Sequence, residues 1–168
     1  MVDILLKFIQ RILFHLIITK YFNMLKAILE TERGTMTIEF FGADAPLTVK
    51  NFTDLAKKGF YDGLLFHRVL PNFVVQAGCP DGTGAGGPGY SIPCELTGEN
   101  QYHDRGVLSM AQRGLNTGGS QFFICHSRDQ TSHLDRKHTC FGKVTEGIEV
   151  LDAIRQGDRI EKITIIEE

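Results

Sequence analysis

Residues 66-FHRVLPNFVVQAG-78 contain two short apolar runs that are separated by a Pro-Asn pair at 71–72. Each run has the length and the β-branched and aromatic content of a strand, and the Pro-Asn pair predicts a turn between them. Side chains alternate across a strand, so Arg68 is expected to share a face with Phe66 and Leu70. A guanidinium on such an apolar face costs free energy unless it has a partner. Arg68 therefore either reaches solvent or a carboxylate, or has a functional role.

The flanking sequence predicts more short strands and only two helices. Apolar and polar residues alternate on both sides of a Glu-Arg-Gly turn near the start, and again near the end of the chain. The strands are expected at 26–31, 35–41, 90–92, 107–111, 121–125, 139–144 and 160–166, and helical spacing covers 46–58 and 148–154. Glycine and proline dominate 78–89, which predicts a surface loop. Without a βαβ rhythm, this pattern predicts a mainly β fold whose antiparallel sheet is closed or folded on itself.

The size and charge of the chain limit the classes of partner. A chain of 168 residues with 42% hydrophobic and 23% charged residues has the size and composition of one globular domain. The formal net charge of −2 provides no basic excess for neutralising phosphates. Nucleic acid is therefore excluded as the main partner, and peptides or small molecules are favoured.

Four cysteines are too widely spaced for a paired-cysteine zinc motif and too few for a disulfide scaffold. We expect free thiols in a reducing, cytoplasmic setting. Cys125 with His126, and His138 with Cys140, suggest a metal or nucleophile site. Adjacent residues in a strand point to opposite faces, which argues against such a site. Carboxylates do not cluster either, so no metal and no cofactor is predicted.

Three short motifs suggest other chemistries and lack the context those chemistries need. The loop 82-GTGAGG-87 fits a dinucleotide fingerprint, yet no helical period follows that would hold a pyrophosphate. The segment 51-NFT-53 is a glycosylation sequon inside a predicted helix of a chain that we expect in the cytoplasm. Ser120 lacks the second glycine of a nucleophile elbow, because Phe122 stands there.

Residues 1–23 differ from the rest of the chain. Their basic positions recur at spacings of four or five among Leu, Ile and Phe, which predicts a basic amphipathic helix. These positions are Lys7, Arg11, His15 and Lys20. The uncharged runs are too short to span a bilayer and no small-residue cleavage site follows, so neither a transmembrane helix nor a signal peptide is predicted. Membrane contact is expected only if this segment is present in the protein; the alternative is a start at Met24.

Four motifs together resemble those of the cyclophilin family of peptidyl-prolyl cis-trans isomerases. They are 66-FHRV-69, 109-SMA-111, 116-NTGGSQFFI-124 and 134-LDRKHTCFGKV-144. Order and spacing match over residues 25–166, so the chain divides into an extension, 1–23, and an isomerase domain, 24–168. The resemblance implies a closed eight-stranded antiparallel β-barrel capped by two α-helices, with an open groove on its exterior. It also implies a monomer that acts on proline-containing peptides and on folded or unfolded protein clients.

Matching positions carry the family's site residues onto this chain. Arg68 corresponds to the catalytic arginine, and Gln76 to the residue that holds this arginine and a substrate carbonyl. The proline-pocket walls correspond to Phe73, Val74, Phe123, Leu134 and His138. Ala111 and Gln112 fall where the groove offers backbone to an extended peptide, and Gln121 stands beside it.

Several positions depart from the family's usual residues. His133 stands where drug-sensitive members commonly carry tryptophan, so an indole donor to cyclosporin is missing and weaker binding of this inhibitor is expected. Gln112 replaces a frequent asparagine and Arg113 a frequent small residue, which affects the preference for residues beside the proline. Val74 is smaller and stiffer than the common methionine.

The expected chemistry is rotation about an Xaa-Pro bond, whose barrier of about 20 kcal/mol reflects lost amide resonance. No covalent bond is broken, so no nucleophile, metal or cofactor is required. We expect the apolar pocket to hold the proline ring while Arg68 donates to the prolyl nitrogen in the twisted state. The alternative is a proline-peptide binding module or chaperone that keeps the groove and turns over poorly.

Overall fold

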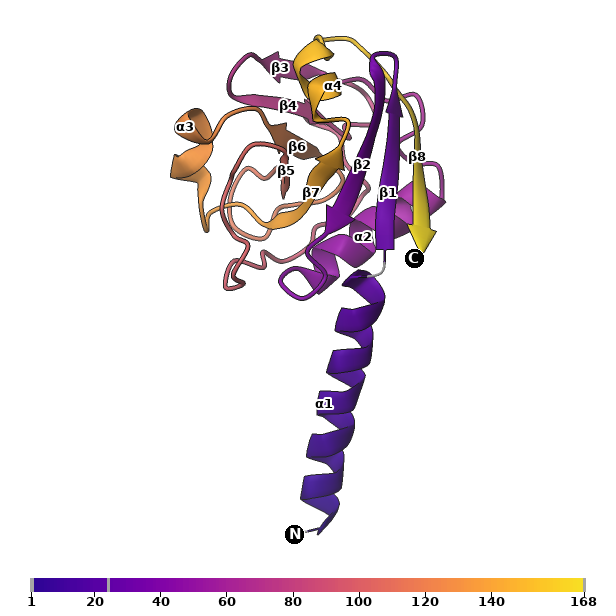
Figure 1. Ribbon diagram of the computed structural model, residues 1–168, viewed down its shortest axis with the longest axis vertical. Coiled ribbons are helices and arrows are strands. Elements are labelled where there is room, and N and C mark those ends of the chain that lie inside the picture. The colour runs from indigo at the N-terminus through magenta and orange to yellow at the C-terminus, as the bar shows by residue number, and fades with distance from the viewer. Residues whose placement is uncertain (1, 24, 168) are drawn as a thin grey trace.

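The computed structural model describes residues 2–23 and 25–167 (Figure 1). Met24, the alternative start, lies outside the described residues. The strands are β1 (Leu25–Thr31), β2 (Gly34–Phe40), β3 (Arg68–Leu70), β4 (Val74–Ala77), β5 (Val107–Met110), β6 (Phe122–Cys125), β7 (Cys140–Glu146) and β8 (Ile160–Glu167). The helices are α1 (Val2–Asn23), α2 (Pro46–Lys57), α3 (Arg128–Thr131) and α4 (Ile148–Ala153), with a 3-10 turn η1 (Ser132–Leu134).

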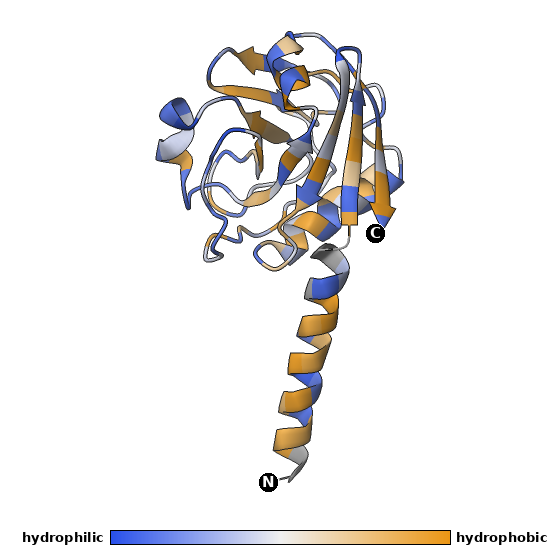
Figure 2. Ribbon diagram, in the orientation of Figure 1, coloured by the Kyte–Doolittle hydropathy of each residue, from blue (hydrophilic) through white to orange (hydrophobic). Residues whose placement is uncertain are grey.

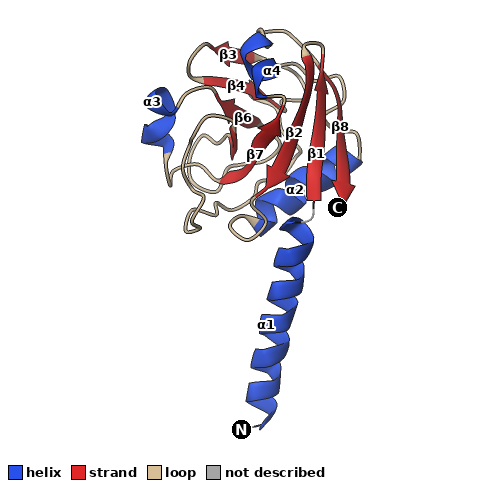
Figure 3. Ribbon diagram, in the orientation of Figure 1, coloured by secondary structure: helices blue, strands red, loops and turns tan. Residues whose placement is uncertain are grey.

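The strands form one curled antiparallel sheet in the order β3-β4-β6-β5-β7-β2-β1-β8 (Figure 3). The predicted hairpin at its start is confirmed: β1 pairs with β2 in the register Ala27↔Ile38 and Leu29↔Met36. Alternate residues of β1 are buried, as the alternation of the sequence requires when one face of a strand meets the core. The sheet wraps around this core.

The expectation of a closed barrel is wrong, because β3 and β8 end the described sheet without forming a ladder with each other. Leu65 and Arg159 form only an isolated bridge, flanked by backbone hydrogen bonds such as Phe66 N to Asp158 O at 2.8 Å. In this register β3 would have to pair with residues 154–156. These residues follow the end of α4 and lead into a turn at Gly157, which has a φ of 92°. The ladder therefore cannot continue, and the eight-stranded barrel stays open.

Helix α2 covers the inner face of the sheet with a ring cluster centred on Phe52. The Phe52 ring lies 4.9 to 5.8 Å from four other rings, measured between centroids, and its side chain is fully buried. These rings belong to Phe40, Tyr61, Phe122 and Phe141. Such a cluster combines apolar burial with edge-to-face ring contacts, and it joins α2 to β2, β6 and β7.

The first turn of α2 is capped from a distant loop. Pro46 begins the helix, and Ala45 before it offers no side-chain acceptor. Glu95 takes that place: its carboxylate accepts hydrogen bonds from the amides of Leu47 at 3.0 Å and Thr48 at 2.9 Å. A carboxylate at a helix N-terminus satisfies free amides and complements the helix dipole. This contact ties the loop after the glycine-rich segment to α2.

Helix α1 confirms the helix predicted within residues 1–23, and it projects away from the body of the protein (Figure 1). Its last turns contact α2, β1 and β2, and the Tyr21 hydroxyl donates to Glu167 at 2.9 Å. In the described part of the chain, no helix meets the length and apolarity needed to cross a membrane.

Two local expectations are wrong. The strand predicted at 90–92 is reduced to a single bridge between Ile92 and Gly118. The expectation of only two helices in the domain is also wrong, because the short helix α3 follows β6; its four residues carry too little periodicity to be detected in the sequence.

Candidate active-site groove

A row of side chains crosses four neighbouring strands on the outer face of the sheet. Arg68 on β3 pairs with Gln76 on β4, Gln76 pairs with Phe123 on β6, and Phe123 pairs with Ser109 on β5. Directly paired residues point to the same side of an antiparallel sheet. The register therefore lines up a guanidinium, an amide and an aromatic ring on one surface.

Alternation explains why Arg68 lies on this surface. Val69, the residue after Arg68, packs against the main core inside the sheet, while Arg68 and Leu70 are exposed. The expectation that Arg68 shares a face with Phe66 is wrong: Phe66 is fully buried and precedes β3, which begins only at Arg68. Because Phe66 lies outside the strand, the period of two does not extend to it.

A hollow of about 240 Å³ opens beside Arg68 on the outer face. Nine of the ten predicted site residues line it. They are Arg68, Phe73, Val74, Gln76, Ala111, Gln112, Phe123, Leu134 and His138. Val74 and Phe123 form its buried floor with Cys125. Phe73 and Ala111 pack against this floor from loops, and Leu134 packs against it from η1. The hollow is thus apolar at its base and polar along the β3–β4 side.

The guanidinium of Arg68 is held by neutral groups. Its Nη1 donates to Oε1 of Gln76 at 3.2 Å, and its Cζ lies 5.8 Å from the centroid of the Phe73 ring. Within the described residues, no carboxylate lies at ion-pair distance from Arg68. The positive charge is therefore oriented but not neutralised, and its remaining N–H groups can donate to a ligand.

A chain of amides fixes the orientation of Gln76. Nε2 of Gln121 donates to the carbonyls of Gly84 and Gly86, each at 2.9 Å, so Oε1 of Gln121 is left to accept. Nε2 of Gln76 donates to that oxygen at 3.0 Å, which turns Oε1 of Gln76 toward Arg68. Gln121, the tenth predicted residue, does not line the hollow beside Arg68. It links this hollow to the glycine-rich loop at 78–89.

His138 closes another side of the hollow as a wall residue. Its Nδ1 donates to the carbonyl of Met110 at 3.1 Å, because a carbonyl oxygen only accepts. Its ring lies 5.7 Å from the ring of Phe123 in an edge-on arrangement. Burial lowers the pKa of His138 from its ordinary value, so the ring is neutral near pH 7. A neutral imidazole presents a largely apolar wall.

A buried polar network behind Phe123 was not found from the sequence. His103 stacks on Phe123 at 5.8 Å between centroids; its Nδ1 lies 3.2 Å from Asp135 and its Nε2 lies 2.8 Å from Oγ of Ser109. Burial lowers the pKa of His103 to about 4, so the neutral ring donates to the carboxylate and accepts from the hydroxyl. This is the order of a serine-hydrolase triad, yet Ser109 is fully buried and no substrate can reach it. The network supports the ring of Phe123 from behind.

The cysteine–histidine pairs considered from the sequence are not formed by chain neighbours. The ring of His126 bonds to the carbonyl of Leu151 at 3.0 Å, whereas Cys125 packs under the hollow. Cys140 instead lies 3.6 Å from ring nitrogens of His103, and burial raises the pKa of its thiol to about 12. All four cysteines are free thiols. Among the described residues, no three His, Cys, Asp or Glu side chains are grouped to hold a metal.

A second hollow of about 450 Å³ continues the groove toward the glycine-rich loop. It shares Gln76, Ala111 and Gln112 with the hollow beside Arg68. Nε2 of Gln112 donates to the carbonyl of Lys137 at 2.6 Å, which fixes the junction between the two hollows. Arg113 reaches across the second hollow and donates to the carbonyl of Gly84 at 3.1 Å. Together the hollows form one elongated groove.

Comparison with known proteins places this geometry in a family. The family model described as "Cyclophilin type peptidyl-prolyl cis-trans isomerase/CLD" matches residues 26–167. A peptidyl-prolyl cis-trans isomerase of Synechococcus elongatus is 55% identical over 145 residues, which cover 85% of this chain and 97% of the relative. One of Helicobacter pylori is 53% identical over 139 residues, or 82% of this chain and 84% of the relative.

Solved structures show the same likeness. A cyclophilin-type peptidyl-prolyl cis-trans isomerase of Cryptosporidium parvum matches with a TM-score of 0.77 and 32% identity, covering 85% of this chain and 98% of the other. The structure of the same protein in the presence of the dipeptide Ala-Pro matches with a TM-score of 0.72. The extent of the family match, the identity to the relatives and the shared fold agree. The chain belongs to the cyclophilin-type peptidyl-prolyl cis-trans isomerase family.

Proposed function

We propose that this protein accelerates cis–trans rotation about Xaa-Pro bonds of peptides and protein clients by binding them in the elongated groove. One observation carries the proposal: an oriented, unneutralised Arg68 stands at the edge of an apolar hollow. A hollow alone would bind proline, and an arginine alone would bind an anion. Their juxtaposition fits a ligand with an apolar ring and an amide nitrogen beside it.

The apolar floor is the part of the groove that suits a proline ring. Phe123 and Val74 are nearly fully buried at its base, while Phe73 and Leu134 flank it. Removal of apolar surface from water contributes roughly 25 cal/mol per Å² to binding. Holding the ring there also keeps water away from the neighbouring amide, which strengthens any hydrogen bond made to it.

Arg68 would act on the amide nitrogen of the bound proline. In the planar amide the nitrogen lone pair is delocalised and accepts poorly, whereas in the twisted state the lone pair localises on nitrogen. A guanidinium N–H aimed at this atom therefore bonds more strongly in the transition state than in either ground state. Each 1.36 kcal/mol of this difference is worth about tenfold in rate. Loss of one preorganised donor in an active site typically costs about 10²–10³ in rate, so Arg68 would supply about two orders of magnitude or more.

Gln76 would position both partners of this interaction. Its carbonyl oxygen holds the guanidinium, and its amide group has a second N–H besides the one donated to Gln121. That N–H is free to bond a substrate carbonyl. Because Gln121 is tied to the loop carbonyls of Gly84 and Gly86, the geometry is set before the substrate arrives. Preorganisation of this kind lowers the cost of reaching the transition state.

Residues that flank the proline would occupy the second hollow. An extended peptide that places its ring beside Arg68 passes the shared positions Gln76, Ala111 and Gln112 and continues over the glycine-rich loop. Arg113 on the rim of this hollow is exposed. We therefore place the selection of neighbouring residues at Gln112 and Arg113.

The direct test is a proline-isomerisation assay with the full chain and a short Xaa-Pro peptide, followed by exchange NMR. We expect the protein to accelerate exchange between the cis and trans forms of the peptide. Without a catalyst this exchange takes tens to hundreds of seconds. A chain that broadens peptide signals through binding, yet leaves the exchange rate unchanged, would be a binding module and would refute catalysis.

His133 provides a test of inhibitor binding. It is exposed and stacks on Phe73 at 5.9 Å between centroids, at the mouth of the hollow. We propose that cyclosporin binds weakly because this position lacks an indole donor. His133→Trp is expected to tighten cyclosporin about tenfold, the value of one added hydrogen bond, in a calorimetric titration. His133→Phe, which keeps an aromatic ring but has no N–H donor, is the matched control; equal gains in both variants would contradict the role of the donor.

We also propose that the protein acts as a monomer in the cytoplasm. Free thiols at all four cysteines support a reducing compartment. The groove is formed by residues of one chain, so catalysis needs no second copy.

A further inference from the structure

Helix α1 exposes more apolar surface than a soluble surface helix normally does. Phe8, Leu13, Leu16 and Ile17 are each more than half exposed, at 62%, 52%, 58% and 65%. Figure 2 shows that apolar residues dominate most of the coloured part of the helix, with polar positions interrupting them. Soluble monomeric proteins rarely expose contiguous apolar patches of this kind, so such a surface indicates a binding partner.

A line of basic side chains runs along one side of α1, which is otherwise largely apolar. Ile9, Ile12 and Leu16 recur at spacings of three and four and therefore share one face. Lys7 and Arg11, followed by His15, recur at intervals of four and form a basic line along the helix. A helix of 22 residues is about 33 Å long at 1.5 Å per residue. The helix thus carries a long apolar face beside a line of cationic side chains.

We propose that α1 lies in the interface of a lipid bilayer that contains anionic lipids and tethers the isomerase to it. The apolar face would enter the boundary between headgroups and acyl chains, and Lys7 and Arg11 would meet lipid phosphates. Residues 1–23 carry three cationic side chains against Asp3, a net charge of +2 with His15 neutral. The remaining residues, with 15 basic against 19 acidic side chains, carry −4, so α1 is the part of the chain that an anionic surface attracts.

A second copy of the chain fits these features less well. Helix pairing buries a seam of about two positions in seven, which would leave much of this broad apolar surface in water. Asp3 is the only acidic residue in 1–23, so the basic line of one copy would find almost no opposite charge on the other. An anionic bilayer satisfies both the apolar face and the basic line at once.

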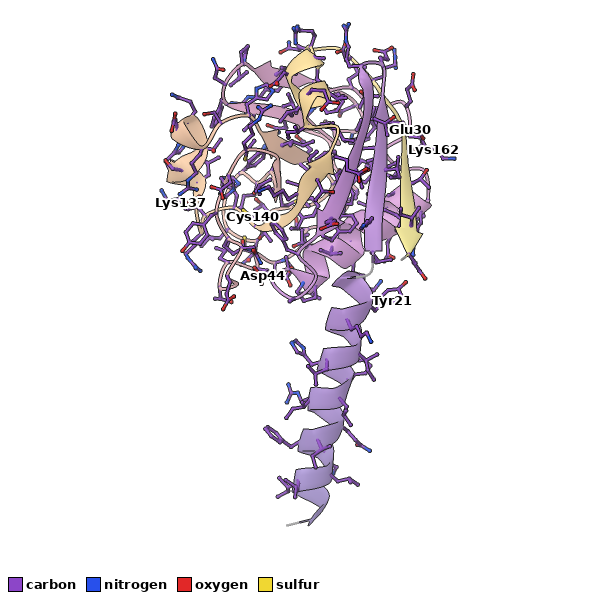
Figure 4. All side chains as sticks on the ribbon, viewed as in Figure 1. Tyr21, Glu30, Asp44, Lys137, Cys140 and Lys162 are labelled. Carbon is purple, nitrogen blue, oxygen red and sulfur yellow. The ribbon has the colours of Figure 1, made fainter. Side chains whose placement is uncertain are left out.

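The attachment of α1 keeps the groove accessible. Ile18 packs against the core and Tyr21, labelled in Figure 4 near the C-terminus, bonds to Glu167. The helix contacts α2, β1 and β2, and none of these elements contributes a residue to either hollow of the groove. A chain bound through α1 would therefore still present the open groove to substrates near the membrane.

The test is sedimentation of the full chain with vesicles of phosphatidylcholine alone or of equal parts phosphatidylcholine and phosphatidylglycerol. We expect at least tenfold stronger binding to the mixed vesicles. The double variant Lys7→Gln/Arg11→Gln should lose more than tenfold on the mixed vesicles, because each basic side chain near an anionic surface contributes roughly fivefold. Ile12→Asp should weaken binding to both kinds of vesicle, since it places a charge in the apolar face.

The matched control is Lys143→Gln/Lys162→Gln, which removes the same charge from exposed positions of the body; Lys162 is labelled in Figure 4, away from α1. Its binding should equal that of wild type, and circular dichroism should show every variant folded. Equal binding of the Lys7→Gln/Arg11→Gln variant and wild type would overturn the proposal. A second result would also overturn the proposal: the chain binds neither kind of vesicle, and sedimentation velocity shows a dimer that Ile12→Asp dissociates. In that case α1 would pair with a second copy.

Discussion

Arg68→Ala is expected to lower kcat for Xaa-Pro isomerisation by about a hundredfold or more, with little change in KM. The guanidinium is oriented by Gln76 and Phe73 and faces the hollow without a carboxylate partner among the described residues. Its hydrogen bond to the prolyl nitrogen is strongest in the twisted state, so its removal costs transition-state stabilisation and leaves substrate binding largely intact. Loss of one preorganised donor typically costs 10²–10³ in rate, on the order of 3–4 kcal/mol.

Exchange NMR on a short Xaa-Pro peptide measures this effect, and urea unfolding checks stability. Arg68 is exposed, so its variant should unfold within about 0.5 kcal/mol of wild type. Lys143→Ala, which removes an exposed cation on β7 away from the groove, should keep full activity. An unchanged kcat in Arg68→Ala would reject the role of the guanidinium while leaving the groove as a binding site.

Phe52→Ala is expected to lower the free energy of unfolding by about 3–5 kcal/mol. The Phe52 side chain is fully buried and its ring contacts four others that come from different elements. Truncation would leave a cavity that these rings cannot fill without leaving their rotamers. Because a domain of this size has a total stability of only about 5–15 kcal/mol, this single change should remove a large part of it.

Urea unfolding measures this loss, and Leu47→Ala is the control on the same helix. Leu47 is 52% exposed, so its truncation should lower the free energy of unfolding by no more than about 0.5–1 kcal/mol. If Phe52→Ala lost no more than Leu47→Ala, the ring cluster would not be the centre of the core. Phe52 lies on the inner side of the sheet and lines neither hollow of the groove. The variant should therefore lose stability while the folded fraction keeps its catalytic rate.

Much of the fold could be predicted from the sequence because its signals are local. Alternation over 26–31 and 35–41 predicts the hairpin, since the period of two reports directly which side of a strand is buried. Helical spacing from Pro46 likewise predicts α2. The prediction of a strand at 90–92 was wrong because a run of three residues carries too little periodicity to specify pairing.

The site was anticipated through motifs rather than through geometry. The resemblance named ten residues, and nine of them line one hollow. The pairing of His103 with Asp135 and Ser109 had no sequence signal. Asp135 is 32 positions from His103 and Ser109 is 6 positions from it, and only the folding of the chain brings the three side chains together. The same holds for Cys140 and His103.

The sequence by itself determined the strands' alternation, the two main helices, the family motifs and the basic amphipathic character of residues 1–23. Only the tertiary structure decided that the sheet stays open and that Arg68 points outward beside Phe123. The physical reason is range: side-chain periodicity acts over a few residues, whereas register is set by packing among segments far apart in the chain. The register Arg68↔Gln76↔Phe123 brings together charge, amide and ring, and no local pattern contains that information.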